Sequence, residues 1–264
     1  MDTEFQWLPQ VWEKISTKIS SGFGLACFDF DNTLFYGDLG EEVLVALARD
    51  GLSHVKEEIP NFFTNPEQVK LALKSKDNFQ LAKLVWEEYE SLLSTKGMEA
   101  AYRWSSFLFS GWKKEEFQKY CREVWNQAQS QKRIGIYSTM KSLIMFLKSH
   151  SWEILVVTAS PTWAVAEVIS EFQLESENVL GMNLKLSQDY STSEILEPYP
   201  YGEGKLQAIL NHKAKTPDLA FGDSINDLPM LSGSKLGVLL DRGRDIDLTQ
   251  ICNQKGILIQ PLAK

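Results

Sequence analysis

The sequence predicts an α/β fold, namely a Rossmann-like parallel sheet core with an all-helical domain inserted into it. From residue 140 onward, short apolar segments typical of strands alternate with segments typical of helices. Alternation of this kind indicates a parallel sheet covered by helices on both faces. Residues 37–136 contain only helical patterns, rich in Glu, Lys, Gln and aromatic residues. The long helical block therefore interrupts the sheet-forming part of the chain.

The first part of the core contributes one helix and one strand. Between residues 7 and 19, apolar side chains recur at helical spacing opposite Glu, Lys and Thr. This pattern predicts an amphipathic helix that covers the sheet. Residues 25–28, Leu-Ala-Cys-Phe, form a short apolar run after a glycine-containing turn. They predict a buried strand that carries Asp29 and Asp31 at its carboxyl end.

The other elements of the core follow in alternation. Strands are predicted at residues 154–157, 179–186, 219–221, 236–240 and 257–259. Helices are predicted at residues 140–146, 163–172, 205–211 and 227–231. Residues 187–204 are rich in Ser, Asp, Tyr, Pro and Gly, and we predict a turn-rich connection there.

Length and charge restrict the classes of function. A chain of 264 residues is long enough for a large core plus a smaller domain. A net charge of -8 with scattered Lys and Arg argues against a nucleic-acid partner. No run approaches the roughly 18 apolar residues of a membrane span, and the acidic start is unlike a signal peptide. We expect no membrane association and a cytoplasmic protein, or a periplasmic one if a leader was removed; the oligomeric state stays open.

Residues suited to phosphate chemistry follow three of the predicted strands, and one more begins a helix. In chain order they are Asp29 and Asp31, then Thr158 and Ala159, then Lys205 on the helix, and finally Asp223, Asn226 and Asp227. The carboxyl ends of parallel strands lie at one edge of a sheet, where such folds bind ligands. We therefore expect four carboxylates, a hydroxyl and an ammonium group to converge there.

This ordered set resembles the four motifs of the haloacid dehalogenase (HAD) superfamily. A lone Asp-x-Asp would be weak evidence for this superfamily, but the presence of all four motifs in order is highly specific evidence. The helical insert resembles the cap of the phosphoserine phosphatase branch, and residues 31–39, Asp-Asn-Thr-Leu-Phe-Tyr-Gly-Asp-Leu, are also similar to phosphorylcholine phosphatase. The resemblance implies a HAD fold in which residues 1–36 and 137–264 form the catalytic core and residues 37–136 form the cap domain.

The resemblance also implies a Mg²⁺-dependent phosphomonoester hydrolase with a phospho-aspartyl intermediate on Asp29. Asp29 and Asp223 would offer carboxylate oxygens to the metal, Asp31 its backbone carbonyl, and Asp227 a supporting contact. Mg²⁺ favours oxygen ligands, and its charge offsets the repulsion between a carboxylate nucleophile and a phosphoryl group. The expected cofactor is therefore Mg²⁺.

Asp31 indicates which reaction class of the superfamily this is. Two residues after the nucleophile, its carboxyl group would protonate the leaving group and then deprotonate the attacking water. Dehalogenases lack an Asp at this position and transport ATPases carry Thr, so the residue favours a phosphatase. Thr158 and Lys205 would bind the phosphoryl group, helped by backbone N–H groups near Ala159. A phosphotransferase and a catalytically silent phosphate-binding module stay open as alternatives.

Two features bear on a small-molecule substrate. Asp38 stands where the phosphoserine phosphatase branch carries a Glu that meets the substrate ammonium, which suits phosphoserine, phosphoethanolamine or phosphorylcholine. Arg49 and Arg103 are the candidates for binding a phosphoserine carboxylate. Asn226 is interpreted either as a turn former or as a hydrogen-bonding partner of the carboxylates and thus part of the substrate site.

The insert is rich in aromatic residues, for which two interpretations remain. They are Phe62, Phe63, Phe79, Trp86, Tyr89, Tyr102, Trp104, Phe107, Phe109 and Trp112. These rings either form the core of a helical bundle or partly surround a quaternary ammonium group through cation–π attraction.

Overall fold

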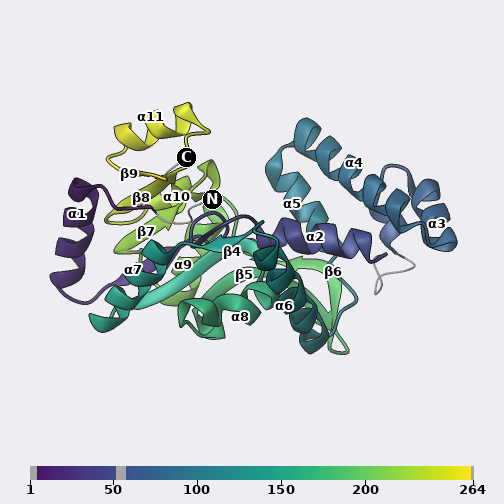
Figure 1. The fold of residues 1–264 in the computed structure, drawn as a ribbon, viewed down its shortest axis with the longest axis horizontal. Helices are drawn as coiled ribbons and strands as arrows, with labels where there is room; N and C mark the ends of the chain where they lie inside the picture. The colour runs from purple at the N-terminus through teal and green to yellow at the C-terminus, as the bar shows by residue number, and fades with distance from the viewer. Residues whose placement is uncertain (1–4, 52–57, 263–264) are drawn as a thin grey trace.

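A computed structural model describes residues 5–51 and 58–262. Its centre is a seven-stranded sheet in the order β6-β5-β4-β1-β7-β8-β9 (Figure 1). The strands are β1 (Leu25–Phe28), β4 (Glu153–Pro161), β5 (Val179–Ser187), β6 (Tyr190–Leu196), β7 (Leu219–Gly222), β8 (Gly237–Asp241) and β9 (Leu258–Pro261). All neighbouring strands are parallel except β6, which is antiparallel to β5. The predicted α/β class is confirmed.

Strand β1 lies in the middle of the sheet because it is apolar on both faces. It pairs with β4 on one side and with β7 on the other, with Phe28 opposite Val156 and Phe221. Its residues alternate between two apolar cores, as the two-residue period of a strand requires. The residue that follows β1 therefore sits at the centre of the carboxyl edge of the sheet.

Helices cover both faces of this sheet, as predicted. They are α1 (Pro9–Ser20), α7 (Ser138–Ser149), α8 (Thr162–Val168), α9 (Glu203–Lys213), α10 (Leu228–Ser232) and α11 (Ile246–Gln254). Buried residues of α1, α7 and α8 belong to the larger apolar core, whereas those of α10 and α11 belong to the smaller one. In the part of the chain that the structure describes, no helix has the length and apolar character needed to cross a bilayer.

The insert lies between two short strands. β2 (Phe35–Tyr36) and β3 (Gly135–Ile136) pair antiparallel, so the chain leaves and re-enters the core at one place. The described residues between them form α2 (Leu39–Arg49), η1 (Ile59–Phe62), α3 (Pro66–Ser75), α4 (Asn78–Lys96), α5 (Met98–Phe107) and α6 (Lys114–Ser130). Helices α2 to α5 gather at one end of the molecule (Figure 1).

Helix α6 differs from the other helices of the insert because it packs along α8 of the core (Figure 1). Arg122 on α6 forms ion pairs with Glu167 at 3.2 Å and Glu171 at 3.1 Å. Cys121 and Trp125 of the same helix are fully buried. The end of the insert is thereby attached to the sheet domain.

The sequence did not predict β6, α11 or the short strands β2 and β3, and β3 lies within the block predicted to be helical. Residues 187–204 contain strand β6, which forms a hairpin with β5 through Gln188 and Asp189, both at positive φ. Most side chains of this hairpin are exposed or half-buried, so the apolar alternation that identifies a strand is missing. Helix α11 buries only Leu248 and Cys252, and Asp245 caps it by accepting a hydrogen bond from the Leu248 N–H at 2.9 Å.

Candidate active site

The predicted site residues converge at the carboxyl edge of the sheet, beneath the helices of the insert. A cavity of about 140 Å³ lies there. Its lining includes Asp29, Asp31, Asp38, Thr158, Ala159, Lys205, Asp223 and Asn226. Asp227 lies behind this wall and is fully buried. The structure thus brings together residues that are as many as 198 positions apart in the sequence.

Asp29 sits in the centre of this group. Its backbone N–H donates to the Phe221 carbonyl at 2.9 Å, which continues the pairing of β1 with β7 past the end of the strand. The carboxylate accepts hydrogen bonds from Lys205 Nζ at 2.5 Å and from Thr33 Oγ1 at 3.2 Å. Burial raises the pKa of Asp29 well above its usual range, while the charge of Lys205 acts in the opposite direction.

Asp227 organises the loop that follows β7. One carboxylate oxygen pairs with Lys205, and the other accepts hydrogen bonds from the N–H groups of Asp223 and Ser224 at 3.0 Å and from the Ser224 hydroxyl at 2.9 Å. A Cβ on Gly222 would lie 2.4 Å from the Asp227 Cβ, so only glycine permits this approach. Both oxygens of Asp227 are therefore engaged by the protein.

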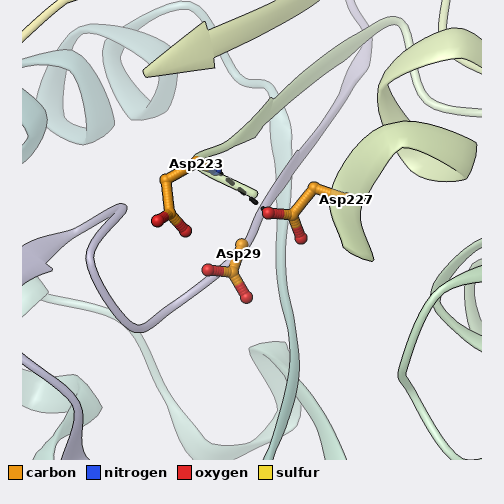
Figure 2. A group of neighbouring side chains, drawn as sticks. All are labelled: Asp29, Asp223 and Asp227. Carbon is orange, nitrogen blue, oxygen red and sulfur yellow. Dashed lines mark hydrogen bonds between the residues drawn. The ribbon is translucent and has the colours of Figure 1, made fainter. Parts of the chain in front are cut away.

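Three carboxylates form a cluster that suits a hard metal ion. One oxygen each from Asp29, Asp223 and Asp227 lies within 4.8 Å of the others, and Figure 2 shows the side chains converging. Asp223 Oδ2 is buried and lies 2.8 Å from Arg242 Nη2. An all-oxygen, negatively charged donor set is the kind that Mg²⁺ prefers. The residues therefore fit the expected ion.

Asp31 bridges the start of the insert and the end of β4. Its Oδ1 accepts the Leu39 N–H at 2.7 Å, and its Oδ2 accepts the hydroxyls of Ser160 at 2.6 Å and Thr158 at 3.4 Å. Burial raises the pKa of Asp31 despite these hydrogen bonds, which favours a protonated form. Ser160 was not predicted as a site residue, although it belongs to the same strand-end motif as Thr158.

Asp38 has two roles in the structure. It is the N-cap of α2, accepting the Glu41 N–H at 2.8 Å, and it also lines the cavity. Burial raises its pKa well above the usual range, and the charges of Asp31 and Glu41 raise it further. Glu41 also lines the cavity and accepts a hydrogen bond from the Tyr89 hydroxyl at 3.4 Å. A second carboxylate thus accompanies Asp38, and sequence reasoning missed it.

Some aromatic residues of the insert line the cavity, and others belong to the core of the helical bundle. Of the ten, Tyr89, Tyr102 and Phe109 line the cavity. Most of the others pack into the apolar core, and Phe79 is exposed. Tyr199 and Tyr201, from the segment between β6 and α9, add two rings to the lining that were not predicted. The bundle-core interpretation therefore accounts for most of these rings, and tyrosines form most of the aromatic wall.

The two arginines that were candidates for binding a substrate carboxylate do not line the cavity. Arg49 pairs with Asp50, and Arg103 pairs with Glu99 and Glu197, all outside the cavity lining.

Asn226 lines the cavity and lies in the 3₁₀ turn Ile225–Asp227, and its amide donates to Met98 Sδ at 3.3 Å. The arginine that does line the cavity is Arg242, directly after β8. Arg242 follows the strand predicted at residues 236–240, and this position at a strand end could have identified it as a candidate site residue.

Comparisons with known proteins agree with this geometry. The family model for haloacid dehalogenase-like hydrolases matches residues 26–232. No curated protein matches the sequence.

Three similar solved structures cover most of the chain. A conserved functionally unknown protein from Anaerococcus prevotii DSM 20548 has a TM-score of 0.76 at 18% identity, covering 98% of this chain and 93% of that chain. A protein with unknown function from Bordetella pertussis Tohama I has a TM-score of 0.67 at 15% identity, covering 90% and 98%. A phospho-aspartyl intermediate analogue of phosphoserine phosphatase has a TM-score of 0.52 at 17% identity, covering 92% and 94%. At these identities the likeness establishes a shared fold. Because the family model spans most of the sequence, the chain belongs to the haloacid dehalogenase-like hydrolases.

Proposed function

We propose that this hydrolase is a Mg²⁺-dependent phosphatase that forms a phospho-aspartyl intermediate on Asp29. Its substrate is a small phosphomonoester whose leaving group carries an ammonium or quaternary ammonium group. The buried carboxylate cluster, the HAD family membership and the likeness to a phosphoserine phosphatase structure support this proposal. We further propose that residues 1–36 and 137–264 act as the catalytic core and residues 37–136 as the cap domain.

The residues divide the reaction between two steps. In the first, an oxygen of Asp29 attacks phosphorus, the bond to the leaving oxygen breaks, and Asp31 donates a proton to that oxygen. In the second, Asp31 takes a proton from water, which attacks phosphorus and releases phosphate from Asp29. Lys205 and Thr158 hold the phosphoryl oxygens through both steps.

A bound Mg²⁺ ion would supply positive charge that lowers the repulsion between nucleophile and phosphoryl group. Asp29 and Asp223 would hold the ion with their carboxylates and Asp31 with its backbone carbonyl. Asp227, whose oxygens are engaged by Lys205 and the 223–224 backbone, would support the site indirectly.

The observation that carries the substrate proposal is the presence of two acidic side chains in the cavity wall. Asp38 and Glu41 line it, and neither forms an ion pair with any residue that the structure describes. Burial raises the pKa of Asp38, and a nearby cation would favour its charged form. Tyrosine rings and hydroxyls line the same cavity, and the Tyr89 hydroxyl donates to Glu41. A cation on the leaving group would balance these carboxylates, and aromatic faces attract it further. The cavity is smaller than the roughly 300–1,000 Å³ of drug-sized sites, which suits a small metabolite.

Substitutions at Asp38 and Glu41 test this substrate class. Asn is as good an N-cap as Asp, so Asp38→Asn removes the charge while keeping the cap. We expect Asp38→Asn and Glu41→Gln each to lower kcat/KM for phosphorylcholine or phosphoethanolamine by about tenfold or more, and to change kcat/KM for an uncharged aryl phosphate little. Asp77→Asn is the matched control, because Asp77 caps α4 without lining the cavity.

Equal losses on charged and uncharged substrates would mean that Asp38 and Glu41 are structural. A wild-type preference for sugar phosphates would also contradict the proposed substrate class. Adding an acceptor alcohol to the assay and analysing the products separates a hydrolase from a phosphotransferase. A catalytically silent module is less consistent with the chain, because every carboxylate of the motifs is present.

A further inference from the structure

We propose that Arg242 is a positioning residue that keeps Asp223 a one-oxygen metal ligand and thereby makes the site favour Mg²⁺ over Ca²⁺. This inference rests on the proposed metal-dependent function. It concerns the geometry of a ligand and not the chemistry of the substrate. Arg242 lies outside the four motifs and directly follows β8, the strand next to β7 in the sheet.

The contact that carries the inference is direct. Arg242 Nη2 lies 2.8 Å from Asp223 Oδ2, and the Asp223 side chain is only 5% exposed. The backbone beside Arg242 is fixed, because Asp241 accepts the Gly243 N–H at 2.7 Å through its side chain and the Leu262 N–H at 2.8 Å through its carbonyl. The guanidinium is thus presented to one particular oxygen of Asp223.

The other carboxylates of the cluster are constrained in the same way. Asp29 has Lys205 on one oxygen and Thr33 on the other, and Asp227 has both oxygens engaged. Asp223 has Arg242 on Oδ2. Each carboxylate of the cluster therefore has a protein group on at least one oxygen, and this contact restrains the carboxylate from turning both oxygens toward one ion.

This constraint discriminates between the two ions. Mg²⁺ requires near-octahedral geometry at about 2.0–2.1 Å and takes carboxylates through single oxygens, with waters completing the shell. Ca²⁺ takes six to eight oxygens at about 2.3–2.6 Å and readily accepts both oxygens of one carboxylate. Holding Asp223 Oδ2 in an ion pair withholds an oxygen that Ca²⁺ can use and Mg²⁺ does not need.

Charge repulsion acts on both ions alike. The guanidinium repels any divalent cation nearby, and because Mg²⁺ and Ca²⁺ carry the same charge, this repulsion weakens both to a similar extent. The ratio of the two dissociation constants therefore isolates the geometric effect of Arg242, whatever happens to the separate affinities.

The experiment measures metal binding without substrate. Isothermal titration gives Kd for Mg²⁺ and for Ca²⁺ in the wild type and in Arg242→Ala, Arg242→Met and Arg244→Ala. Met keeps much of the apolar stem but has no donors, so it should behave like Ala. Arg244 is an exposed neighbour outside the cavity lining and is the matched control.

We expect Kd(Ca²⁺)/Kd(Mg²⁺) to fall about tenfold in both Arg242 variants and to stay unchanged in Arg244→Ala. A ratio that is unchanged or higher in folded Arg242 variants, checked by circular dichroism, would overturn the inference while leaving the proposed phosphatase intact. A wild type that binds neither ion, with Asp223→Asn identical to it, would overturn the metal-dependent function and this inference with it.

Discussion

At the scale of single residues, the charge of Lys205 stabilises the candidate site. Its side chain is 4% exposed, and its ammonium group contacts both Asp29 and Asp227. Burial lowers the pKa of Lys205, but the two carboxylates outweigh burial and raise it above its usual value. Removing a buried cation that lies between two buried anions strongly destabilises the folded protein, because both carboxylates would then lack their counter-charge.

The first prediction concerns Asp29. Asp29→Asn removes the proposed nucleophile with almost no change in shape, so kcat should fall more than about 10³-fold while the fold persists. Phosphate release measures kcat, and circular dichroism measures folding. A variant that keeps about a tenth of wild-type kcat would contradict the assignment of Asp29 as the nucleophile.

A second prediction concerns the stability that Lys205 provides. Lys205→Met leaves Asp29 and Asp227 buried without their cation, so the free energy of unfolding should fall by about 3–5 kcal/mol. Lys235→Met is the control, since Lys235 pairs with Asp218 at 2.8 Å but is 64% exposed and should contribute about 0–1 kcal/mol. Urea unfolding at pH 7 compares the two variants, and similar losses would contradict the prediction.

At the scale of elements, the position of each strand decides where its terminal residue lies. The first strand pairs with β4 and β7 in parallel, so the residues after all three reach the same edge. At the amino-terminal edge of the sheet, the Asp218 carboxylate accepts a hydrogen bond from the Leu25 N–H at 3.0 Å and forms ion pairs with Lys18 and Lys235. Asp218 therefore anchors the start of β1 beside the start of β7.

The third prediction follows from the pKa of Asp218. Partial burial raises it, but hydrogen bonds from Lys235 and the Leu25 N–H and the charge of Lys18 outweigh burial, so the pKa is lowered. The contribution of Asp218 to stability is therefore present above the unfolded-state pKa of about 3.9 and is lost as pH falls through the lower folded-state value.

We expect Asp218→Ala to lower the free energy of unfolding by about 1–3 kcal/mol at pH 7. The difference from wild type should narrow below about pH 4. Urea unfolding across this pH range measures both effects, with the exposed Asp247→Ala as control. A loss that does not depend on pH would contradict the role given to the Asp218 charge.

At the scale of the whole molecule, the cavity depends on both parts of the chain. Its carboxylates come from the ends of β1 and β7 and from the start of α2, and its aromatic wall comes from α4, α5 and the segment before α9. The sheet edge can recognise a phosphoryl group, which all phosphomonoesters share. Selection among leaving groups therefore has to come from the residues of the insert and the facing tyrosines.

The fourth prediction concerns the dependence of phosphatase activity on the bound metal ion. Chelation with EDTA should abolish phosphate release, and added Mg²⁺ should restore it, whereas Ca²⁺ should not. The reason is geometric, because the small ion holds Asp29 and the phosphoryl group in line for attack and the larger ion does not. Undiminished turnover in EDTA, or full turnover in Ca²⁺, would contradict the proposed mechanism.

The sequence by itself determined the fold class and the residues at the strand ends. Buried parallel strands are continuous apolar runs, and the polar residue that ends each run is visible without a structure, as at Asp29, Thr158 and Asp223. Strand β6 was not visible in this way, because an exposed edge strand carries few apolar residues.

Tertiary structure alone decided which other side chains share the cavity. Glu41 and Tyr199 lie far apart in the sequence, and no local pattern distinguishes them from surface residues of the same type. Arg242 follows a predicted strand, but the sequence does not show that it faces Asp223. Their place depends on how the insert sits over the sheet and on which strand neighbours β7. A motif can be recognised from the few residues next to one strand end. An ion pair such as that of Arg242 with Asp223 joins different strand ends and depends on how the whole chain packs.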